Sequence, residues 1–472
     1  MKKLFLGFVI AAAAILFTGC LPEEFIWWSP DGRTAAVRTA EGLRVADAEG
    51  RLSPVVLPGE IQSAAWLPDG TGLLVSRVLK AEDWTEAQAM IPPEEAAATM
   101  ALARGLPELL KSGLIATGGA REQFEDKFLK PLAVTLGESL EPAWFCAVHL
   151  HHDRILAALA GFTNTAALEA EILSAQTNTL SVYELSLLPM REGWPADEPR
   201  ARVRSLRSLL TPIVSPRHPV VAYRTGDGSL VAMPLEGGKS AVVAAERVAW
   251  AAWAADGRAL LHVTMGESES DFVGEIRISA VIGEEGRLLT GEPRAETLAL
   301  MALPGGVRPR LGVLPDGRLL FASLPFTLPA RVGSIQSGAR FYLLDPTRPD
   351  AAPGPVEIKA GSLPDDLSTF ALSPDGRFVA VAEAGTDTVA VLELATGRVR
   401  VVSGSEAGWK TRLVPAWRNT RELTFAAAPP PATRPELILW QADAPARVLS
   451  RDWPDGVVKP WLEAPGGGQP AR

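Results

Sequence analysis

Cysteine and histidine are scarce in this chain. Its 472 residues include two cysteines and five histidines. Two cysteines cannot build the set of several disulfides that holds small exported domains together. Five histidines leave few ligands for a metal site and few general bases for histidine-dependent catalysis.

The common catalytic and nucleotide-binding motifs are also absent. No G-x-S-x-G nucleophile elbow, Walker loop or dinucleotide fingerprint occurs in the sequence. These absences argue against an α/β-hydrolase and against proteins that bind nucleotides through those loops. Asp and Glu remain available as a general acid or base. We therefore assign no catalytic, cofactor-binding or metal-ligating residue, and the chain is more readily a non-enzyme than an enzyme.

Long apolar runs and excess positive charge are missing from most of the chain. Beyond the N-terminal segment, no stretch approaches the ~20 apolar residues that cross a bilayer. The formal net charge is −9. Because nucleic-acid binding depends on neutralising phosphates with Lys and Arg, nucleic acid is not expected as a partner.

The N-terminus, MKKLFLGFVIAAAAILFTGC, has the pattern of an export signal. Lys2 and Lys3 precede an apolar run from Leu4 to Phe17 that is too short to span a membrane. The closing FTGC resembles the lipobox of bacterial lipoproteins, with Cys20 as the lipid-attachment residue and residues 1–19 as the signal peptide. An ordinary signal peptide with a nearby cysteine is the alternative.

The lipoprotein resemblance implies a location in the cell envelope. Residues 20–26 would form a short lipidated anchor, and several acyl chains on Cys20 would hold the protein to a membrane. Leu21, rather than Asp, at the next position implies the outer membrane, with the protein facing the periplasm.

A unit with an apolar strand, a Pro-Asp-Gly turn and a second strand recurs along the chain. Pro, Asp and Gly suit such a turn because Pro fixes φ, Asp bonds its own backbone and Gly adopts positive φ. Further alternating strands can be recognised after each copy. The copies occupy residues 27–37, 64–78, 251–265, 311–324 and 370–383, with weaker ones at 212–224 and 413–428.

Repeated four-stranded units predict an all-β fold, a β-propeller. The best count is seven four-stranded blades, with six or eight as alternatives, because the copies at Ser215 and Arg418 lack Asp-Gly and are placed by spacing. The SPDGR turn resembles the TolB-like (WD-repeat-like) propeller family. The propeller would comprise residues 27–79 and 179–454, followed by a C-terminal tail at 455–472.

Four tryptophans occupy one position of the repeat, the end of its first strand. They are Trp28, Trp66, Trp253 and Trp417. Because the position recurs, we expect these side chains to pack between blades rather than to form a sugar-binding surface.

Residues 80–178 interrupt blade two with a helix-favouring composition. Apolar residues recur at spacing four in 120–138, where Pro131 should kink or end the helix, and again in 142–161. Three to five helices are expected, packed into a small cap. The segment contains seven Lys and Arg against fourteen Asp and Glu, a net charge of −7. This acidity indicates either solvated helix faces or a docking surface for a basic protein.

One cluster in this segment has metal-ligand residue types. Cys146, His149 and Asp153 share a helical face, and His151 and His152 lie between them. The spacing lacks the helical zinc pair with its intervening Glu, so a buried histidine and cysteine are the favoured interpretation.

Two functions follow from these observations. The first is a membrane-anchored propeller scaffold that binds other envelope proteins, including ones with a basic surface, on its rim and helical cap. The second is a ligand-binding or hydrolytic lipoprotein that uses the central channel. Inward-facing carboxylates or histidines from several blades would favour the second, and a plugged channel the first.

Overall fold

The computed structural model describes most of the chain in two compact units. The helical unit consists of Arg77–Leu185 and Val203–Leu209, and the propeller unit of Leu21–Ser76, Ser186–Arg202 and Leu210–Arg472. The described residues are 24–118, 121–160, 176–245, 247–265, 273–291, 294–303, 309–325, 338–348, 351–365, 367, 369–382, 388–403, 410–411, 414–427, 434–442, 444–459 and 462–463.

Seven antiparallel sheets of four consecutive strands form the propeller. Blade one contains β1 (Ile26–Trp28), β2 (Thr34–Thr39), β3 (Gly42–Asp47) and β4 (Leu57–Pro58). Blade two contains β5 (Glu60–Trp66), β6 (Gly72–Ala81), β7 (Leu180–Arg191) and β8 (Trp194–Pro195), with β9 (Arg200–Ser205) paired to β7. Blade three contains β10 (Leu209–Val214), β11 (Val220–Thr225), β12 (Leu230–Pro234) and β13 (Ala241–Ala244).

The other four blades repeat this order. Blade four contains β14 (Val248–Trp253), β15 (Ala259–Met265), β16 (Val273–Ala280) and β17 (Ala295–Ala302). Blade five contains β18 (Leu311–Val313), β19 (Leu319–Ser323), β20 (Arg340–Leu344) and β21 (Gly354–Pro355). Blade six contains β22 (Phe370–Leu372), β23 (Phe378–Ala382), β24 (Val389–Glu393) and β25 (Arg398–Ser403). Blade seven contains β27 (Ala416–Trp417), β28 (Glu422–Ala427), β29 (Glu436–Gln441) and β30 (Ala444–Val448).

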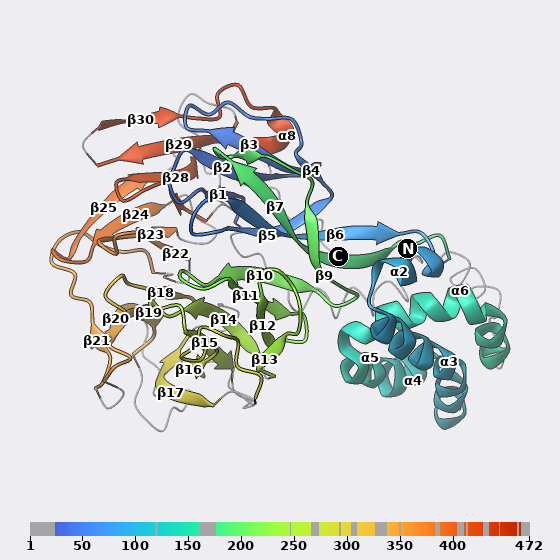
Figure 1. Ribbon diagram of the computed structural model, residues 1–472. Helices are drawn as coiled ribbons and strands as arrows, with labels where there is room; N and C mark the ends of the chain where they lie inside the picture. Colours follow the sequence, from blue (N-terminus) through green and yellow to red (C-terminus); the bar gives the residue numbers. More distant parts are fainter. Residues whose placement is uncertain are drawn as a thin grey trace. The chain divides into compact units, whose positions relative to one another are not determined.

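The blades follow one another around a ring in chain order (Figure 1). The prediction of a seven-bladed propeller is therefore confirmed, including blades three and seven, which lack the Asp-Gly turn. A short pair of strands, β26 (Lys410–Thr411) and β31 (Leu462–Glu463), lies outside the blades.

The repeated turns have the geometry that their residues favour. The glycines of the five Asp-Gly copies all have positive φ, between 66° and 88°. Each preceding aspartate accepts a hydrogen bond from the backbone N–H two residues later, as Asp316 does from Arg318 at 3.1 Å. In blades three and seven, Ser215 and Asn419 take over this accepting role. In these two turns a different side chain therefore accepts backbone N–H groups, and no residue of either turn adopts the positive φ of the Asp-Gly copies.

The four repeated tryptophans lie between blades, as predicted. Three of them donate an indole hydrogen bond to a carbonyl of the preceding blade's first strand: Trp66 to Trp27, Trp253 to Ile213 and Trp417 to Ala371, at 2.8–3.1 Å. Trp28 donates instead to the Thr424 hydroxyl of blade seven at 2.9 Å. Each indole therefore fixes the distance between neighbouring blades as well as burying apolar area.

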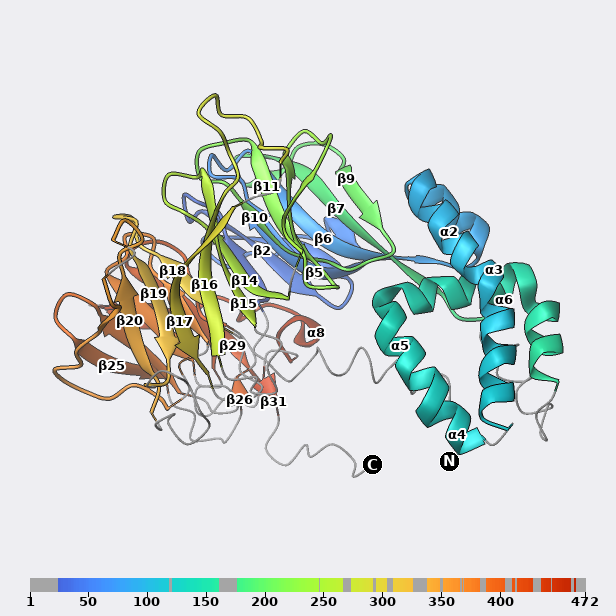
Figure 2. The same cartoon turned by 90° about the horizontal axis from the view of Figure 1, so that it is seen from below.

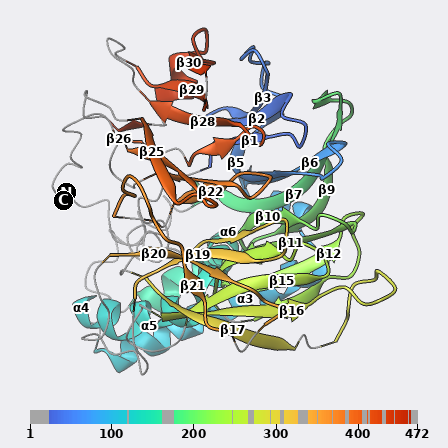
Figure 3. The same cartoon turned by 90° about the vertical axis from the view of Figure 1, so that its left-hand side faces the viewer.

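Blade seven and blade one close the ring side by side (Figure 3) without exchanging a strand. Arg418 donates to the Gly32 carbonyl at 2.8 Å, and its guanidinium lies 5.2 Å from the centre of the Trp28 ring. Trp453 donates to the Gly50 carbonyl. Among the described residues, side-chain contacts rather than a shared strand therefore close the ring.

The segment from Asp455, which the sequence places in the tail, contributes to this closure. It forms the short helix α8 (Asp455–Val458). Val457 and Val458 are buried in the cluster that joins blades seven and one. The packed part of the propeller unit therefore reaches beyond residue 454.

The helical segment of blade two is confirmed, and its helices lie between β6 and β7 in the chain (Figure 2). They are α2 (Trp84–Met90), α3 (Pro93–Ala116), α4 (Arg121–Phe124), α5 (Lys130–Leu136) and α6 (Leu140–Leu159), with a π-helical turn at Glu125–Leu129 and a 3-10 turn at Gly137–Ser139. Asp83 caps α2 by accepting the Glu86 N–H, and Pro93 occupies the first turn of α3. Pro131 lies in the first turn of α5, so the helix changes type before it, as expected of a residue without an N–H.

A single hydrophobic cluster holds the helical unit together. It joins Trp84 of α2, Leu106 of α3 and Val148 of α6 to residues of β7. The segment 203–209 belongs to the same unit because Glu95 accepts hydrogen bonds from the Ser205 hydroxyl and the Leu206 N–H, both at 2.9 Å. The unit is therefore formed from two stretches of chain rather than from the inserted residues alone.

Candidate functional site

The Cys-His cluster of the sequence does not form a set of metal ligands among the residues that the structure describes. Cys146 is fully buried in the hydrophobic cluster, and burial raises the pKa of its thiol to about 12. His149 Nδ1 lies 2.9 Å from the Phe145 carbonyl oxygen, within hydrogen-bonding distance. His152 and Asp153 pair on the surface, and the helix is distorted at His151. The cysteine therefore remains a protonated core residue.

Cys20, the predicted lipid-attachment residue, lies outside the described residues. Within the described part of the chain, no helix combines the length and apolarity needed to cross a bilayer. Lipid attachment therefore stays a prediction from the sequence.

A Ser-His pair lies within blade four but is closed to substrate. His262 Nε2 lies 3.0 Å from the Ser279 hydroxyl, and both side chains are 0% exposed. Burial, with a smaller contribution from Arg277, lowers the pKa of His262 to about 4. A nucleophile must contact its substrate, so this neutral, enclosed pair stabilises the sheet rather than catalyses a reaction.

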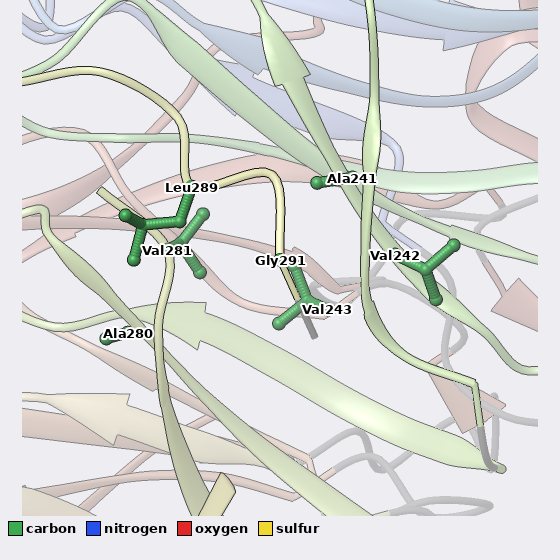
Figure 4. A pocket seen from close by; sticks show the side chains of 7 residues that line it. All are labelled: Ala241, Val242, Val243, Ala280, Val281, Leu289 and Gly291. Atoms are coloured by element: carbon green, nitrogen blue, oxygen red, sulfur yellow. The ribbon is translucent and has the colours of Figure 1, made fainter. Parts of the chain in front are cut away.

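A small depression between β13 and the β16–β17 connection offers little room for a ligand (Figure 4). Its lining is apolar: Ala241, Val242, Val243, Ala280, Val281, Leu289 and Gly291. The volume open to the centre of a water molecule is about 10 Å³. That is roughly the least that holds one water, and the lining offers no polar side chain to orient a substrate.

The centre of the ring contains a more informative group. In a ring of four-stranded antiparallel blades, the first strand of every blade begins at the same end of the central channel, which we call the entry mouth. Glu24 lies two residues before β1 of blade one, and Arg310 directly precedes β18 of blade five. Arg310 Nη2 donates to Glu24 Oε1 at 2.6 Å, although the two residues are 286 positions apart. The chain before β1 therefore reaches across the entry mouth.

Two tryptophans complete this group, which we call the mouth cluster: Glu24, Trp27, Trp250 and Arg310. Trp27 Nε1 donates to Glu24 Oε2 at 3.1 Å. The Arg310 guanidinium lies 4.9 Å from the centre of the Trp250 ring, a distance at which cation–π attraction operates. The carboxylate thus receives one charged and one neutral donor, and its own charge is neutralised by Arg310.

The mouth cluster can hold a carboxylate but offers no pair of titratable groups for acid–base catalysis. The sequence analysis did not single out any of its residues. The repeat marked Trp27 as a first-strand residue, whereas Trp250 lies just before the copy at 251–265, and no local pattern distinguishes Glu24 or Arg310 from the charged residues near them.

The surface of the helical unit carries apolar side chains exposed to solvent. Large apolar residues that are exposed in the described structure number nine, and four of them belong to this unit: Leu109 (39% exposed), Ile115 (74%), Val134 (85%) and Leu150 (45%). Acidic side chains are exposed on the same unit, including Glu108, Asp126 and Asp153. These three carboxylates pair with Lys130, His152 and Arg154, so the exposed apolar side chains accompany charges of both signs with a net excess of acidic residues.

Comparison with known proteins identifies similar folds but no family. No family model matches the chain, and no curated protein matches it. Among solved structures, the chain is 12% identical to the Cps50 (Swd1) β-propeller domain of Myceliophteria thermophila, covering 89% of this chain and 98% of that one with a TM-score of 0.45. It is 14% identical to puromycin hydrolase, covering 93% of this chain and 55% of that one with a TM-score of 0.47. It is 14% identical to TolB from Agrobacterium tumefaciens, covering 53% of this chain and 84% of that one with a TM-score of 0.34. The assignment as a β-propeller rests on the seven sheets of this chain.

Proposed function

We propose that this protein is a membrane-anchored propeller scaffold that binds another protein of the bacterial cell envelope through its helical unit. The observation that carries the proposal is the surface of that unit, where exposed Ile115 and Val134 accompany an excess of acidic residues. A basic partner with apolar side chains would complement it. The lipobox-like sequence before Cys20 supports anchoring to a membrane, and Leu21 after it supports the outer membrane, facing the periplasm.

The described residues favour binding over catalysis. The buried Ser-His pair cannot meet a substrate, and the mouth cluster neutralises its own carboxylate. A rigid ring that positions one inserted segment is a common way for a scaffold to present a binding surface.

The anchor and the docking surface can be tested separately. Cys20→Ser should move the protein from the membrane fraction to the soluble fraction, because the acyl chains would be lost. For docking, the full-length anchored protein is crosslinked mildly in its host envelope and isolated. A variant in which Asn-Gly replaces residues 82–178 serves as comparison, since β6 and β7 pair in one sheet and a two-residue turn can join them.

Charge-reversal variants keep the fold and sharpen the test. Glu108, Asp126 and Asp153 are exchanged together for Lys in the helical unit, where their side chains are 64–87% exposed. The matched control exchanges Glu49, Glu236 and Glu285 of the propeller, which are 70–81% exposed. We expect capture of one reproducible partner to fall at least about tenfold for the first set and to remain for the control, and to weaken with salt. Equal capture by both sets would overturn the docking surface.

A further inference from the structure

We propose that the entry mouth of the propeller is a binding site for a carboxylate ligand, and that Glu24 is the chain's own occupant of that site. The site consists of Arg310, Trp27 and Trp250. This inference is independent of the scaffold proposal, because it concerns the centre of the ring and not the helical unit.

The first argument is the geometry around the Glu24 carboxylate. Each oxygen receives its own donor, Arg310 Nη2 at 2.6 Å and Trp27 Nε1 at 3.1 Å. Charge-assisted hydrogen bonds of this kind are about twice as strong as neutral ones. The donors therefore select a planar anion with two oxygens, which describes a carboxylate.

The second argument is that Arg310 is held in place without Glu24. Its guanidinium lies over the Trp250 ring, and its side chain is 18% exposed. The stacking orients the donors from blade four, whereas the carboxylate comes from the chain before blade one. A receptor that is pre-organised by other residues keeps its geometry when the occupant leaves, which is a requirement for exchange of ligands.

The third argument is that Glu24, the occupant, is more exposed than Arg310 and lies outside every strand. The Glu24 side chain is 38% exposed, and the residue precedes β1. Trp250 Nε1 is buried without a hydrogen-bond partner. This unpaired donor belongs to the same ring on which the Arg310 guanidinium lies, and Glu24 does not satisfy it. Binding of an external carboxylate would therefore displace the chain that precedes β1.

The internal occupant determines what should be measured. A tethered group acts at an effective concentration in the millimolar range or above, so an external ligand must compete with it. Glutarate serves as the probe, because its terminal carboxylate matches the Glu side chain. Its binding to the full-length protein is measured by isothermal titration calorimetry for the wild type and for Glu24→Ala. Glutaramide, which has no charge, is the matched ligand control.

We expect the Kd for glutarate to be at least about tenfold lower for Glu24→Ala than for the wild type, which corresponds to about 1.4 kcal/mol. Glu41→Ala controls for the loss of one negative charge, because Glu41 pairs with Arg44 on the surface of blade one. It should leave the Kd unchanged. Glu24→Gln, which keeps the side-chain shape, should give the same direction as Glu24→Ala.

A second variant assigns the binding to Arg310. In the Glu24→Ala background, Arg310→Met keeps an unbranched side chain but removes its donors, and glutarate binding should disappear. Unchanged glutarate binding in that double variant would overturn the proposal. Equal affinities of wild type and Glu24→Ala, or absence of binding to a Glu24→Ala protein whose thermal unfolding is normal, would overturn it as well.

Discussion

In the propeller unit, each hydrophobic cluster lies between two neighbouring blades, whereas in the helical unit one cluster joins α2, α3 and α6. Six clusters of the ring combine residues of consecutive blades, such as Phe341 of blade five with Phe370 of blade six. The helical cluster has a single centre around Trp84 and Val148. A destabilising substitution in the ring should therefore weaken mainly the interface between two neighbouring blades. A destabilising substitution in the helical cluster should weaken the packing of all the helices that it joins.

The strongest way to separate the two regions is to remove the large side chain at the centre of the helical cluster. Trp84 is 2% exposed. Trp84→Ala should destabilise the helical unit by about 3–5 kcal/mol, because it removes a large buried surface and leaves a cavity. Hydrogen exchange should accelerate throughout α2, α3 and α6 and remain slow in β14–β25. Equal acceleration in the blades would show that the two units unfold together.

The second prediction places acid sensitivity in the ring. His262 is buried and neutral, with a pKa of about 4 in the folded protein. Below pH 6.5 this histidine is protonated in the unfolded chain but stays neutral in the folded chain until the pH approaches 4. Its contribution to stability is therefore complete above pH 6.5 and decreases as the pH falls toward 4, by about 3 kcal/mol in all.

His262→Gln removes this titration. Urea unfolding between pH 7.5 and 4.5, followed in the blades, should show a smaller loss of stability for the variant than for the wild type. Parallel pH profiles would contradict the assignment. Arg277 lies opposite His262 in the pairing of β15 and β16.

A third prediction compares the closing interface with an ordinary one. Arg418 is 13% exposed and bonds the Gly32 carbonyl across the junction of blades seven and one. Arg418→Met should lower the free energy of unfolding by about 2 kcal/mol, because a charged hydrogen bond and a cation–π contact are lost.

Arg377 offers the matched control for this variant. It also lies over an aromatic ring, that of Phe378, but is 60% exposed and pairs with Glu393 on the surface. Arg377→Met should cost less than about 1 kcal/mol in the same thermal or urea unfolding experiment. Similar losses for the two variants would mean that the closing interface is no more sensitive than the others.

The smallest expected effect concerns two turns of equal conformation. Gly70 and Gly376 have φ of 72° and 70°. An added Cβ would approach no atom closer than 4.0 Å at Gly70 but would lie 2.6 Å from Pro315 Cδ at Gly376. Gly70→Ala should cost about 1 kcal/mol for the backbone conformation alone, and Gly376→Ala about 1 kcal/mol more for crowding. Urea unfolding of both variants measures the difference, and equal losses would show that crowding is relieved.

The repeat explains why most of the ring could be predicted from sequence. Asp-Gly turns and the tryptophans at the ends of first strands act locally or between neighbours, so their spacing alone indicates their place. Blades three and seven required the periodicity, because Ser215 and Asn419 replace the aspartate in ways that the turn motif does not show.

The contacts that could not be predicted from the sequence join residues that meet only after the whole chain has folded. Glu24 meets Arg310 only because seven blades bring their first strands to one mouth, and no local pattern links positions 286 residues apart. Likewise, segment 203–209 joins the helical unit through Glu95, a residue whose partners are separated from it by more than a hundred positions. Long-range polar contacts carry no periodic signal in one sequence.

The absence of strand exchange at the junction of blades seven and one has a consequence for how such a chain can vary. Every blade is built from four strands that are consecutive in the sequence, so each junction between blades is also a boundary between two segments of the sequence. One segment can then be moved, duplicated or replaced, provided that the side-chain contacts and the few backbone hydrogen bonds to its neighbours, such as Val248 N–H to the Gly228 carbonyl, are re-established. Each blade of such a protein is a unit that contacts only its two neighbours, so the order of the blades in the sequence is less constrained than the contacts at each junction.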